Sequence, residues 1–463
     1  MGCACRSLER VDALSEVRTM AHQHLDAWLD QLAPWFEQPR APTLPELSGL
    51  FTRTRSQLLG GCLQALTEAL YGELREQRQI DCPGCAKRLS RKRLDPKQLN
   101  TLQGTFTLER PYFYCQDCNR GYHPLDQALE LTRAFHQYDV QEKVLKLATE
   151  MPYERAAELV SELTGVAVSN HHGHATLSRV AESADLDTVI PDESEIRRRI
   201  EQAKASAQDK PVLVAALDGA HAPTRSRARR NQKRGTGQWR EVKGIRLYLA
   251  PAEGRIIQLA SWHQIQDAEA MRRDLHRIAA RIPQRAVRIA LLGDGAAWVW
   301  NTLGECFPAA RQVLDYYHCS EHLHRLAESQ YHEPTQAAQW VEATMARLSQ
   351  DRVSDVIGGI RRMLPRSVAA LEERDRLITY LQNQRGRLGY DACRNQGIPI
   401  GSGGIESANK FISHVRLKRS GAWWVVENGN AMLRLRCAMY NGTFERVFEK
   451  YRAIQREEAG TIR

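Results

Sequence analysis

The feature that most constrains this chain is an unbroken apolar run, residues 212–217, that leads directly into Asp218. Six small or aliphatic residues in a row are typical of a strand that is buried on both faces. A carboxylate at the end of such a strand is costly to desolvate unless a cation or a hydrogen-bond donor meets it. Asp218 is therefore either a cap of the following turn, which is the commoner role of a lone aspartate at such a place, or part of a site to which other segments contribute.

A second apolar run, residues 287–293, leads into Asp294 in the same way. Between and after the two runs, the sequence predicts strands at 241–249, 255–262 and 312–317 and helices at 266–282 and from 296 onward. This is the β-β-β-α-β-α-β order of an RNase H-like core, an α/β fold with a mixed five-stranded sheet and helices. The first and fourth strands of that fold are parallel neighbours, so we expect Asp218 and Asp294 to lie close together.

Glu406 is the third candidate carboxylate. It follows a glycine-rich turn at 401–404 and lies one position from the apolar stripe of a predicted helix. The stripe consists of Ile405, Ala408, Ile412 and Val415. Carboxylates at short range repel one another unless a divalent cation lies between them, and all-oxygen ligand sets suit Mg²⁺ or Mn²⁺. We therefore expect Asp218, Asp294 and Glu406 to hold two such ions, about 4 Å apart, in an active site.

The residues around these acids, at 217–219, 293–295 and 403–410, resemble the DDE core of bacterial insertion-sequence transposases. They are most similar to the ISKra4 family, within the wider Mutator-like group. Cys319 and His322 match the C-x-x-H signature that this group carries after the second aspartate. The role of this pair stays open between a core thiol with an ordering hydrogen bond and a further metal site.

The resemblance extends over roughly residues 150–440, and residues 323–400 fit the mostly helical insertion that these relatives carry before the glutamate. It implies that Asp218, Asp294 and Glu406 bind the catalytic metal ions. It further implies cleavage at terminal inverted repeats, which frees 3′-hydroxyl groups that attack target DNA.

Two CxxC pairs predict a zinc-ribbon-like module. Cys82 and Cys85 form the first pair and Cys115 and Cys118 the second, and each pair can supply two corners of a tetrahedron around zinc. Residues 104–113 alternate like a strand, and the long gap between the pairs leaves room for a hairpin. Four thiolates leave no open coordination position, so one structural Zn²⁺ is expected. Two unliganded pairs or a redox dithiol are the alternatives.

Residues 153–163 and 169–180 predict two helices joined by a glycine-containing turn, which is the spacing of a helix-turn-helix. Asn170, His171 and His174 lie at the start of the second helix, where a recognition helix meets base edges. An ordinary helical hairpin has the same pattern.

The charge balance favours a polyanionic partner, since 65 Lys and Arg residues against 55 Asp and Glu residues give a net charge of +10. We predict double-stranded DNA, both as transposon ends and as target. The further candidate DNA contacts are Arg225, Arg229, Arg230, Arg416, Lys418, Arg419 and Trp423. The paired tryptophans at 423–424 suit either base stacking or a place in the core.

No run of eighteen apolar residues and no signal-peptide core is present in the sequence. The expectation is a cytoplasmic bacterial protein that associates with the nucleoid and binds no membrane. Because transposition brings two DNA ends together, a homodimer or a larger assembly on DNA is expected.

Seven segments are predicted along the chain. They are an N-terminal helical region (1–78), the zinc-ribbon-like module (79–128), the helix-turn-helix region (129–184), a linker (185–210), the first part of the core (211–322), the helical insertion (323–400), and the last part of the core with a helical tail (401–463). Two other functions fit these patterns: a transposase-derived DNA-binding regulator without catalysis, and an RNase H-like nuclease that cuts without joining.

Overall fold

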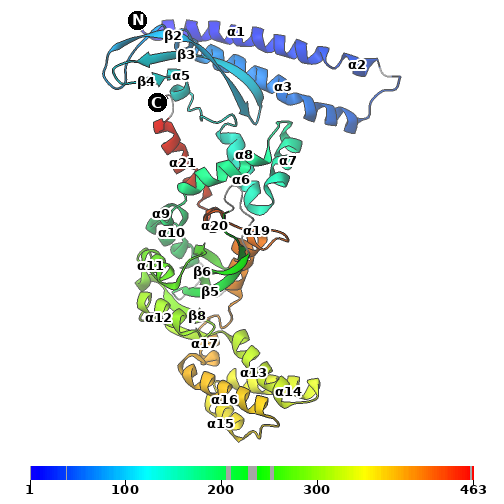
Figure 1. Ribbon diagram of the computed structural model, residues 1–463, viewed down its shortest axis with the longest axis vertical. Helices are drawn as coiled ribbons and strands as arrows, with labels where there is room; N and C mark the ends of the chain where they lie inside the picture. Colours follow the sequence, from blue (N-terminus) through cyan, green and yellow to red (C-terminus); the bar gives the residue numbers. More distant parts are fainter. Residues whose placement is uncertain are drawn as a thin grey trace. The chain divides into compact units, whose positions relative to one another are not determined.

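The computed structural model describes residues 2–37, 39–204, 210–227, 237–250, 255–458 and 461–462. The chain forms two compact units, one made of residues 1–183 with 448–463 and the other made of residues 184–447 (Figure 1). Among the described residues, no helix is both long enough and apolar enough to cross a membrane.

A mixed five-stranded sheet forms the centre of the second unit, in the order β7-β6-β5-β8-β9. Its strands are β5 (Val212–Thr224), β6 (Gln238–Ala250), β7 (Ile257–Gln264), β8 (Arg288–Gly293) and β9 (Arg311–Leu314). β6 pairs antiparallel with both β5 and β7, whereas β8 pairs parallel with both β5 and β9. The predicted mixed sheet, with its first and fourth strands as parallel neighbours, is confirmed.

Helices cover this sheet. They are α9 (Leu186–Val189), α10 (Glu193–Lys204), α11 (Ala268–Ala279), α12 (Ala297–Cys306), α18 (Gly403–Ala408) and α20 (Val426–Asn441), with a short η1 (Gln284–Ala286) before β8. α12 contacts β5 and β8, α18 contacts β5 and β6, and α10 and α20 contact β7. Every residue from 212 to 217 is buried, so both faces of β5 are covered, as its unbroken apolar run predicts. The segment predicted as a linker, 185–210, contributes α9 and α10 to this unit.

The segment predicted as an insertion is helical. It contains α13 (Tyr316–Gln330), α14 (Pro334–Leu348), α15 (Val353–Arg362), α16 (Val368–Asn383), η2 (Arg385–Arg387) and α17 (Tyr390–Asn395). α13 packs against α14 and α16, and α15 packs against both α14 and α16 (Figure 1).

Two predicted details are wrong. The fifth strand ends at Leu314 and not at 317, because the Asp315 carboxylate accepts a hydrogen bond from Tyr317 N at 2.9 Å and so caps α13. The predicted stripe through Val415 also fails. A π-helical turn, η3 (Asn409–His414), follows α18, and its wider turn changes which side chains face the sheet. In the following α19 (Val415–Leu417), Val415 is exposed.

The first unit combines helices with an antiparallel sheet. Its helices are α1 (Gly2–Asp30), α2 (Ala33–Phe36), α3 (Leu44–Leu70), α4 (Gly72–Glu76), α5 (Pro124–Ala128), α6 (Tyr138–Glu150), α7 (Tyr153–Thr164) and α8 (Asn170–Glu182). Its strands are β1 (Gln79–Asp81), β2 (Arg88–Thr101), β3 (Gly104–Cys115), β4 (Arg120–Tyr122) and β10 (Thr461–Ile462), paired in that order. The β2–β3 hairpin fills the long gap between the two CxxC pairs.

The C-terminal helix α21 (Phe444–Glu458) begins in the second unit and ends in the first. From Phe448 onward it packs on α6: the Tyr451 hydroxyl donates a hydrogen bond to Gln141 Oε1 at 3.0 Å. β10 then pairs with β4. Residues 401–463 were predicted as one segment with the core. Their last part, residues 448–463, belongs to the first unit instead.

Candidate active site

Asp218 and Asp294 occupy matching places on neighbouring strands. The parallel pairing of β5 and β8 ends at Ala216 and Leu292, and each aspartate lies two residues beyond this last pair. β8 ends at Gly293, so Asp294 lies in the turn directly after its strand. The register therefore places the two residues beside each other, and the turn sets the direction of the Asp294 side chain. β5 continues to Thr224, paired there with β6 and, at Thr224, bridged to Trp424. Asp218 therefore lies where β5 and β8 diverge, and not at the end of its strand as predicted.

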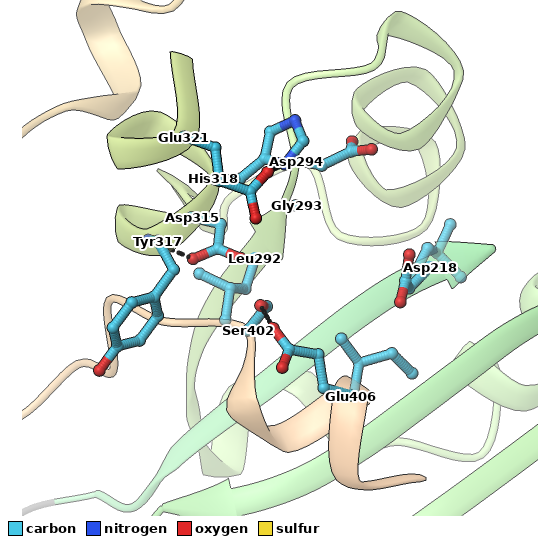
Figure 2. A pocket seen from close by; sticks show the side chains of 12 residues that line it. Asp218, Leu292, Gly293, Asp294, Asp315, Tyr317, His318, Glu321, Ser402 and Glu406 are labelled. Atoms are coloured by element: carbon cyan, nitrogen blue, oxygen red, sulfur yellow. Dashed lines mark hydrogen bonds and ion pairs between the residues drawn. The ribbon is translucent and has the colours of Figure 1, made fainter. Parts of the chain in front are cut away.

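Glu406 reaches the same cavity from α18. Figure 2 shows the three carboxylates on three separate elements around one opening. The cavity measures about 220 Å³, and Leu217, Leu292 and Ile405 supply apolar parts of its wall. At about 30 Å³ per water molecule, this volume corresponds to roughly seven waters, which is enough for two cations with some of their water ligands.

Backbone and side-chain donors hold the two aspartates. Asp218 Oδ1 accepts from its neighbour Gly219 N at 2.7 Å, and Asp218 Oδ2 accepts from Asn409 Nδ2 at 2.6 Å. Asp294 Oδ1 accepts from Ala296 N at 2.9 Å. Each carboxylate oxygen can accept two hydrogen bonds, so both aspartates keep acceptor positions for a further ligand.

The electrostatics of the cavity favour a bound cation. Burial raises the pKa of the Asp218 carboxyl, and the nearby charges of Asp294 and Glu406 raise it further. Of the described residues that line the cavity, none is a lysine or an arginine. Carboxylate oxygens with no cation beside them are ligands of the kind that Mg²⁺ and Mn²⁺ prefer. The three acids lie too far apart in this structure to form a complete ligand group, and the four cysteines described below are the one such group among the described residues.

A buried arginine fixes the start of α18 and thereby Glu406. Arg246 on β6 donates hydrogen bonds to the carbonyl of Gly404 and, at 3.0 Å, to Gln258 Oε1. A Cβ atom at Gly404 would lie 2.7 Å from the Tyr248 ring, so only glycine lets the helix approach the sheet this closely. The glycine-rich turn therefore has a packing role.

The helical insertion braces the loop that carries Asp294. The Tyr380 hydroxyl of α16 donates to the Asp294 carbonyl at 3.1 Å, and Gln384 Nε2 donates to the Gly295 carbonyl at 3.0 Å. Gly295 has a φ of +106°, which favours glycine. Side chains of the insertion thus contact the backbone of Asp294 and of the residue after it.

Cys319 and His322, the signature pair, have separate surroundings. Cys319 is fully buried, and burial raises the pKa of its thiol to about 12, so the group stays protonated. The His322 ring stacks on Tyr380 with 3.9 Å between ring centroids, and burial lowers its pKa to about 4. Neither residue belongs to a group of three or more His, Cys, Asp and Glu side chains that could hold a metal ion among the described residues, so the structure favours the core-thiol interpretation.

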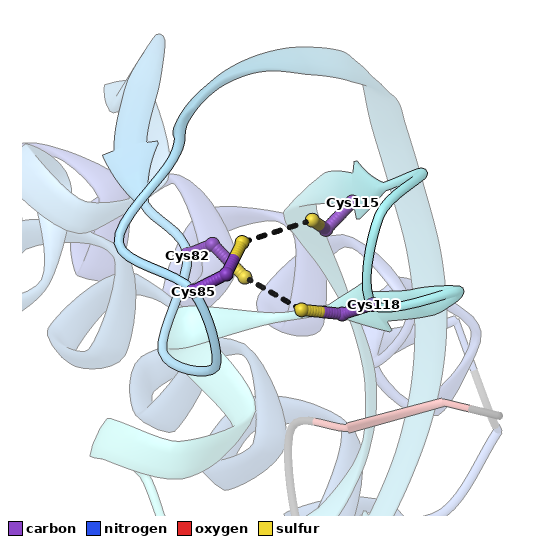
Figure 3. Close-up of side chains that lie close together, drawn as sticks. All are labelled: Cys82, Cys85, Cys115 and Cys118. Carbon is purple, nitrogen blue, oxygen red and sulfur yellow. Dashed lines mark hydrogen bonds between the residues drawn. The ribbon is translucent and has the colours of Figure 1, made fainter.

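The four cysteines of the CxxC pairs converge, as Figure 3 shows. Their sulfurs lie within 4.8 Å of one another, with 3.7 Å between Cys82 and Cys118 and 3.6 Å between Cys85 and Cys115. A tetrahedron with Zn–S bonds of about 2.3 Å has sulfur–sulfur edges of about 3.8 Å. The cluster can therefore hold a structural metal ion such as zinc, and no other such His, Cys, Asp and Glu group exists among the described residues.

Residues 43–452 match the uncharacterised protein family UPF0236. The chain belongs to this family. Among solved structures, it is similar to one described as the Drosophila P element transposase strand transfer complex, with 10% sequence identity over 68% of this chain and 80% of that chain. The TM-score of 0.25 is too low to establish a shared fold. A search of curated proteins finds no match.

In this UPF0236 chain, α7 and α8 form the predicted pair of helices, and Gly165 with a φ of +73° ends α7. His171 and His174 are exposed on α8, and His174 meets Tyr153 edge-on at 5.6 Å. The side chain of Asn170 lies outside the described part of the structure. The exposed start of α8 is compatible with a recognition helix.

The remaining candidate DNA contacts lie near the outer end of β5 and around α19. Lys418 and Arg419 are exposed, and Trp423 is 40% exposed. Arg416, by contrast, is only 4% exposed and lies over the Trp424 ring at 5.3 Å, so its guanidinium is not presented to solvent.

Arg225 is half-buried, and its backbone N–H donates to the Trp424 carbonyl at 2.9 Å. Arg229 and Arg230 fall outside the described residues.

The sequence analysis gave no role to several residues that support the cavity of Asp218, Asp294 and Glu406. They are Arg246, Tyr380, Gln384, Ser402 and Asn409. One signal was available for Asn409, since a residue three positions after Glu406 lies on an adjacent helical face. The contacts of Tyr380 and Gln384 depend on how the insertion folds, and no local pattern indicates them.

Proposed function

We propose that this chain is a DDE-type DNA transposase of an insertion sequence, in which Asp218, Asp294 and Glu406 hold two Mg²⁺ or Mn²⁺ ions. The observation that carries the proposal is that three carboxylates from two register-matched strands and a separate helix line one cavity. The strand order and directions are those expected of an RNase H-like core, and the acid motifs are those that resemble ISKra4-type transposases.

Divalent ions, when bound, activate the attacking oxygen and stabilise the leaving oxygen of an in-line phosphodiester displacement. The contribution of the chain is to fix the ligands. Gly219 N and Asn409 orient Asp218, Ala296 N orients Asp294, and Ser402 donates a hydrogen bond to Glu406.

The other modules serve DNA binding in this proposal. One Zn²⁺ held by Cys82, Cys85, Cys115 and Cys118 stabilises the β1–β4 region, and α8 enters the major groove. Exposed cations such as Lys418 and Arg419 contact phosphates. The protein acts as a homodimer or larger assembly on DNA, in the bacterial cytoplasm.

The direct test uses a labelled duplex that carries the inverted repeats flanking the coding sequence, a target plasmid and Mg²⁺. We expect strand cleavage at the repeat ends and joined products. Asp218→Ala, Asp294→Ala and Glu406→Gln should each lower the rate at least about 100-fold, whereas Glu321→Gln, an exposed residue at the rim of the cavity, should keep most activity.

Three results separate this proposal from its rivals. Cleavage without joining would identify a nuclease. Specific binding of the repeats without cleavage by the wild type would identify a DNA-binding regulator. Cleavage that survives Asp218→Ala would place the chemistry elsewhere and end the proposal.

A further inference from the structure

A row of three residues crosses the sheet behind the cavity. Asp218 on β5 pairs with Gly244 on β6, and Gly244 pairs with His263 on β7. Residues paired across neighbouring strands direct their side chains to the same face. Because Gly244 has no side chain, the row leaves a gap between Asp218 and His263 on that face.

Asn409 lies in this gap. Its Nδ2 donates to Asp218 Oδ2 at 2.6 Å, and its Oδ1 would lie 3.0 Å from a Cβ atom built on Gly244. His263 Nδ1 would lie 2.7 Å from the same atom. The amide oxygen of Asn409 and the imidazole of His263 therefore both lie against the backbone of Gly244, where a larger residue would have its side chain.

Both groups are buried and short of partners. Asn409 is 4% exposed and His263 is 0% exposed. Within the described part of the chain, Asn409 Oδ1 and both ring nitrogens of His263 have no hydrogen-bond partner. A buried polar atom without a partner costs about 1–3 kcal/mol, so two such groups side by side are best explained by an interaction with each other through one buried water.

We propose that Asn409 and His263 form a positioning relay for Asp218, in which a His263 ring N–H reaches Asn409 Oδ1 through one buried water and so orients the Asn409 amide toward Asp218 Oδ2. The relay deepens the proposed function, because it rests on Asp218 being a metal ligand. Neither Asn409 nor His263 lines the cavity, so both act through the Asp218 carboxylate.

The protonation state of His263 suits this role. Burial lowers its pKa to about 3, and the charges of Arg246 and His414 act in the same direction. A neutral imidazole carries one N–H donor and one acceptor nitrogen. The neutral ring can therefore act as a donor toward the amide oxygen of Asn409, and it adds no positive charge near the acids.

The backbone that carries Asn409 is also specialised. Asn409 begins the π-helical turn η3, and the buried Arg436 donates to the carbonyls of Phe411 and, at 2.9 Å, Ile412 in that turn. π-helical turns occur frequently at functional sites. In this turn Asn409, Ile412 and Ser413 are buried.

The hydrogen bonds from Asn409 and from Gly219 N, one to each oxygen, hold the Asp218 carboxylate in one orientation. The lone pairs of Asp218 that are left free then point in a fixed direction. Hydrogen bonds that orient a metal ligand are commonly worth about 10–100-fold in metal affinity.

The first test measures Mn²⁺ binding by full-length Asn409→Ala in titration calorimetry. We expect affinity about 10–100-fold weaker than that of the wild type. Asn441→Ala is the matched control, because Asn441 is equally buried and bonds the backbone of Val189 and Ser261 instead. That variant should unfold at a lower temperature with unchanged Mn²⁺ affinity. Wild-type affinity in Asn409→Ala would overturn the relay.

A glycine variant tests the same gap from the sheet side. In Gly244→Ala the new Cβ would lie 2.6 Å from His263 Cε1, so the relay must shift. Gly359→Ala is the control, since a Cβ there meets nothing within 4 Å. We expect weaker Mn²⁺ binding for Gly244→Ala alone, and equal binding by both variants would contradict the proposal.

A readout without metal separates the relay from the proposed function. In protein labelled with ¹⁵N-histidine, the buried His263 ring N–H should give a slowly exchanging proton signal that shifts or disappears in Asn409→Ala. If this signal is present but the wild type neither binds Mn²⁺ nor cleaves DNA, the proposed function fails and the contact stands. If cleavage occurs and the signal does not respond to Asn409→Ala, the relay fails alone.

Discussion

Asp218 combines burial with two like charges nearby, and this has a consequence for stability. Its folded-state pKa lies above the usual value of 3.8. The folded state therefore holds the proton more tightly than the unfolded state, and ionisation costs stability. The cost is absent below pH 3.8, grows as the pH rises from there to the folded-state pKa, and is complete above that pKa.

Asp218→Asn should accordingly raise the thermal midpoint of the metal-free protein at pH 7, by roughly 2–4 °C if about 1 kcal/mol is recovered. The gain should vanish near pH 3. Differential scanning calorimetry in EDTA measures it. Asp375→Asn, at an exposed aspartate paired with Arg374, should change little. A lower thermal midpoint for Asp218→Asn than for the wild type at neutral pH would show that the ionised carboxylate stabilises the metal-free folded protein.

The cysteine cluster lies beside a small core. The buried residues around it are Ile80, Cys82, Leu89, Phe113, Cys115 and Tyr122. A core of this size contributes little burial energy, so a metal is expected to supply the cross-link.

We predict that the wild-type protein binds one zinc ion per chain and that Cys115→Ser binds none, as measured by elemental analysis after dialysis. The Cys62→Ser variant changes a half-buried cysteine of the same unit outside the cluster and should retain the zinc. Metal-free wild-type protein that is fully folded would rule out a structural role for the cluster.

At the scale of elements, α16 ties the insertion to the sheet. Tyr380 and Gln384 lie one helical turn apart, and each donates to a carbonyl of the Asp294–Gly295 pair. Both carbonyls belong to the turn that directs Asp294 into the cavity. The helix therefore helps to determine where Asp294, one of the three proposed metal ligands, lies.

Gln384→Ala should lower the free energy of unfolding by about 1 kcal/mol and should weaken Mn²⁺ binding several-fold, because the Asp294 turn loses one of its donors. Gln382→Ala, at an exposed position on the same helix, provides the comparison. Denaturant titration and calorimetry report the two effects separately. Unchanged Mn²⁺ affinity in Gln384→Ala would show that the turn holds its shape without the brace.

At the scale of the whole molecule, the two candidate metal centres belong to different units. The cysteine cluster lies in the unit of residues 1–183 with 448–463, and the three acids lie in the unit of residues 184–447. Each unit has its own sheet and its own buried residues.

Removal of zinc should therefore act on one unit only. Treatment with a zinc chelator that leaves Mn²⁺ in place should lower the midpoint of one thermal transition and leave a second, Mn²⁺-stabilised transition unchanged. Asp218→Asn should show the converse pattern, with the Mn²⁺ effect lost and the zinc effect retained. A single transition that responds equally to both metals would mean that the units unfold together.

The sequence alone was sufficient for features that depend on local pattern. The apolar runs before Asp218 and Asp294 predicted two strands buried on both faces, because an unbroken run of this kind is stable only when both faces are covered. The order of strands and helices predicted the parallel pairing of β5 and β8. The CxxC spacing predicted the cysteine cluster, because two residues between ligands make a tight knuckle.

Only the tertiary structure decided which distant residues support these features. After the π-helical turn, Val415 is exposed and Arg416 is buried. The regular α-helical spacing of apolar residues in the sequence does not predict this change of buried face. Asn409 meets Asp218 across 191 positions, and the end of α21 joins the first unit. Such contacts depend on how elements pack, and packing is a property of facing surfaces far apart in the chain. The acids could be singled out from their local setting, whereas the contacts of Arg246, Tyr380 and Gln384 that support them are visible only in the folded protein.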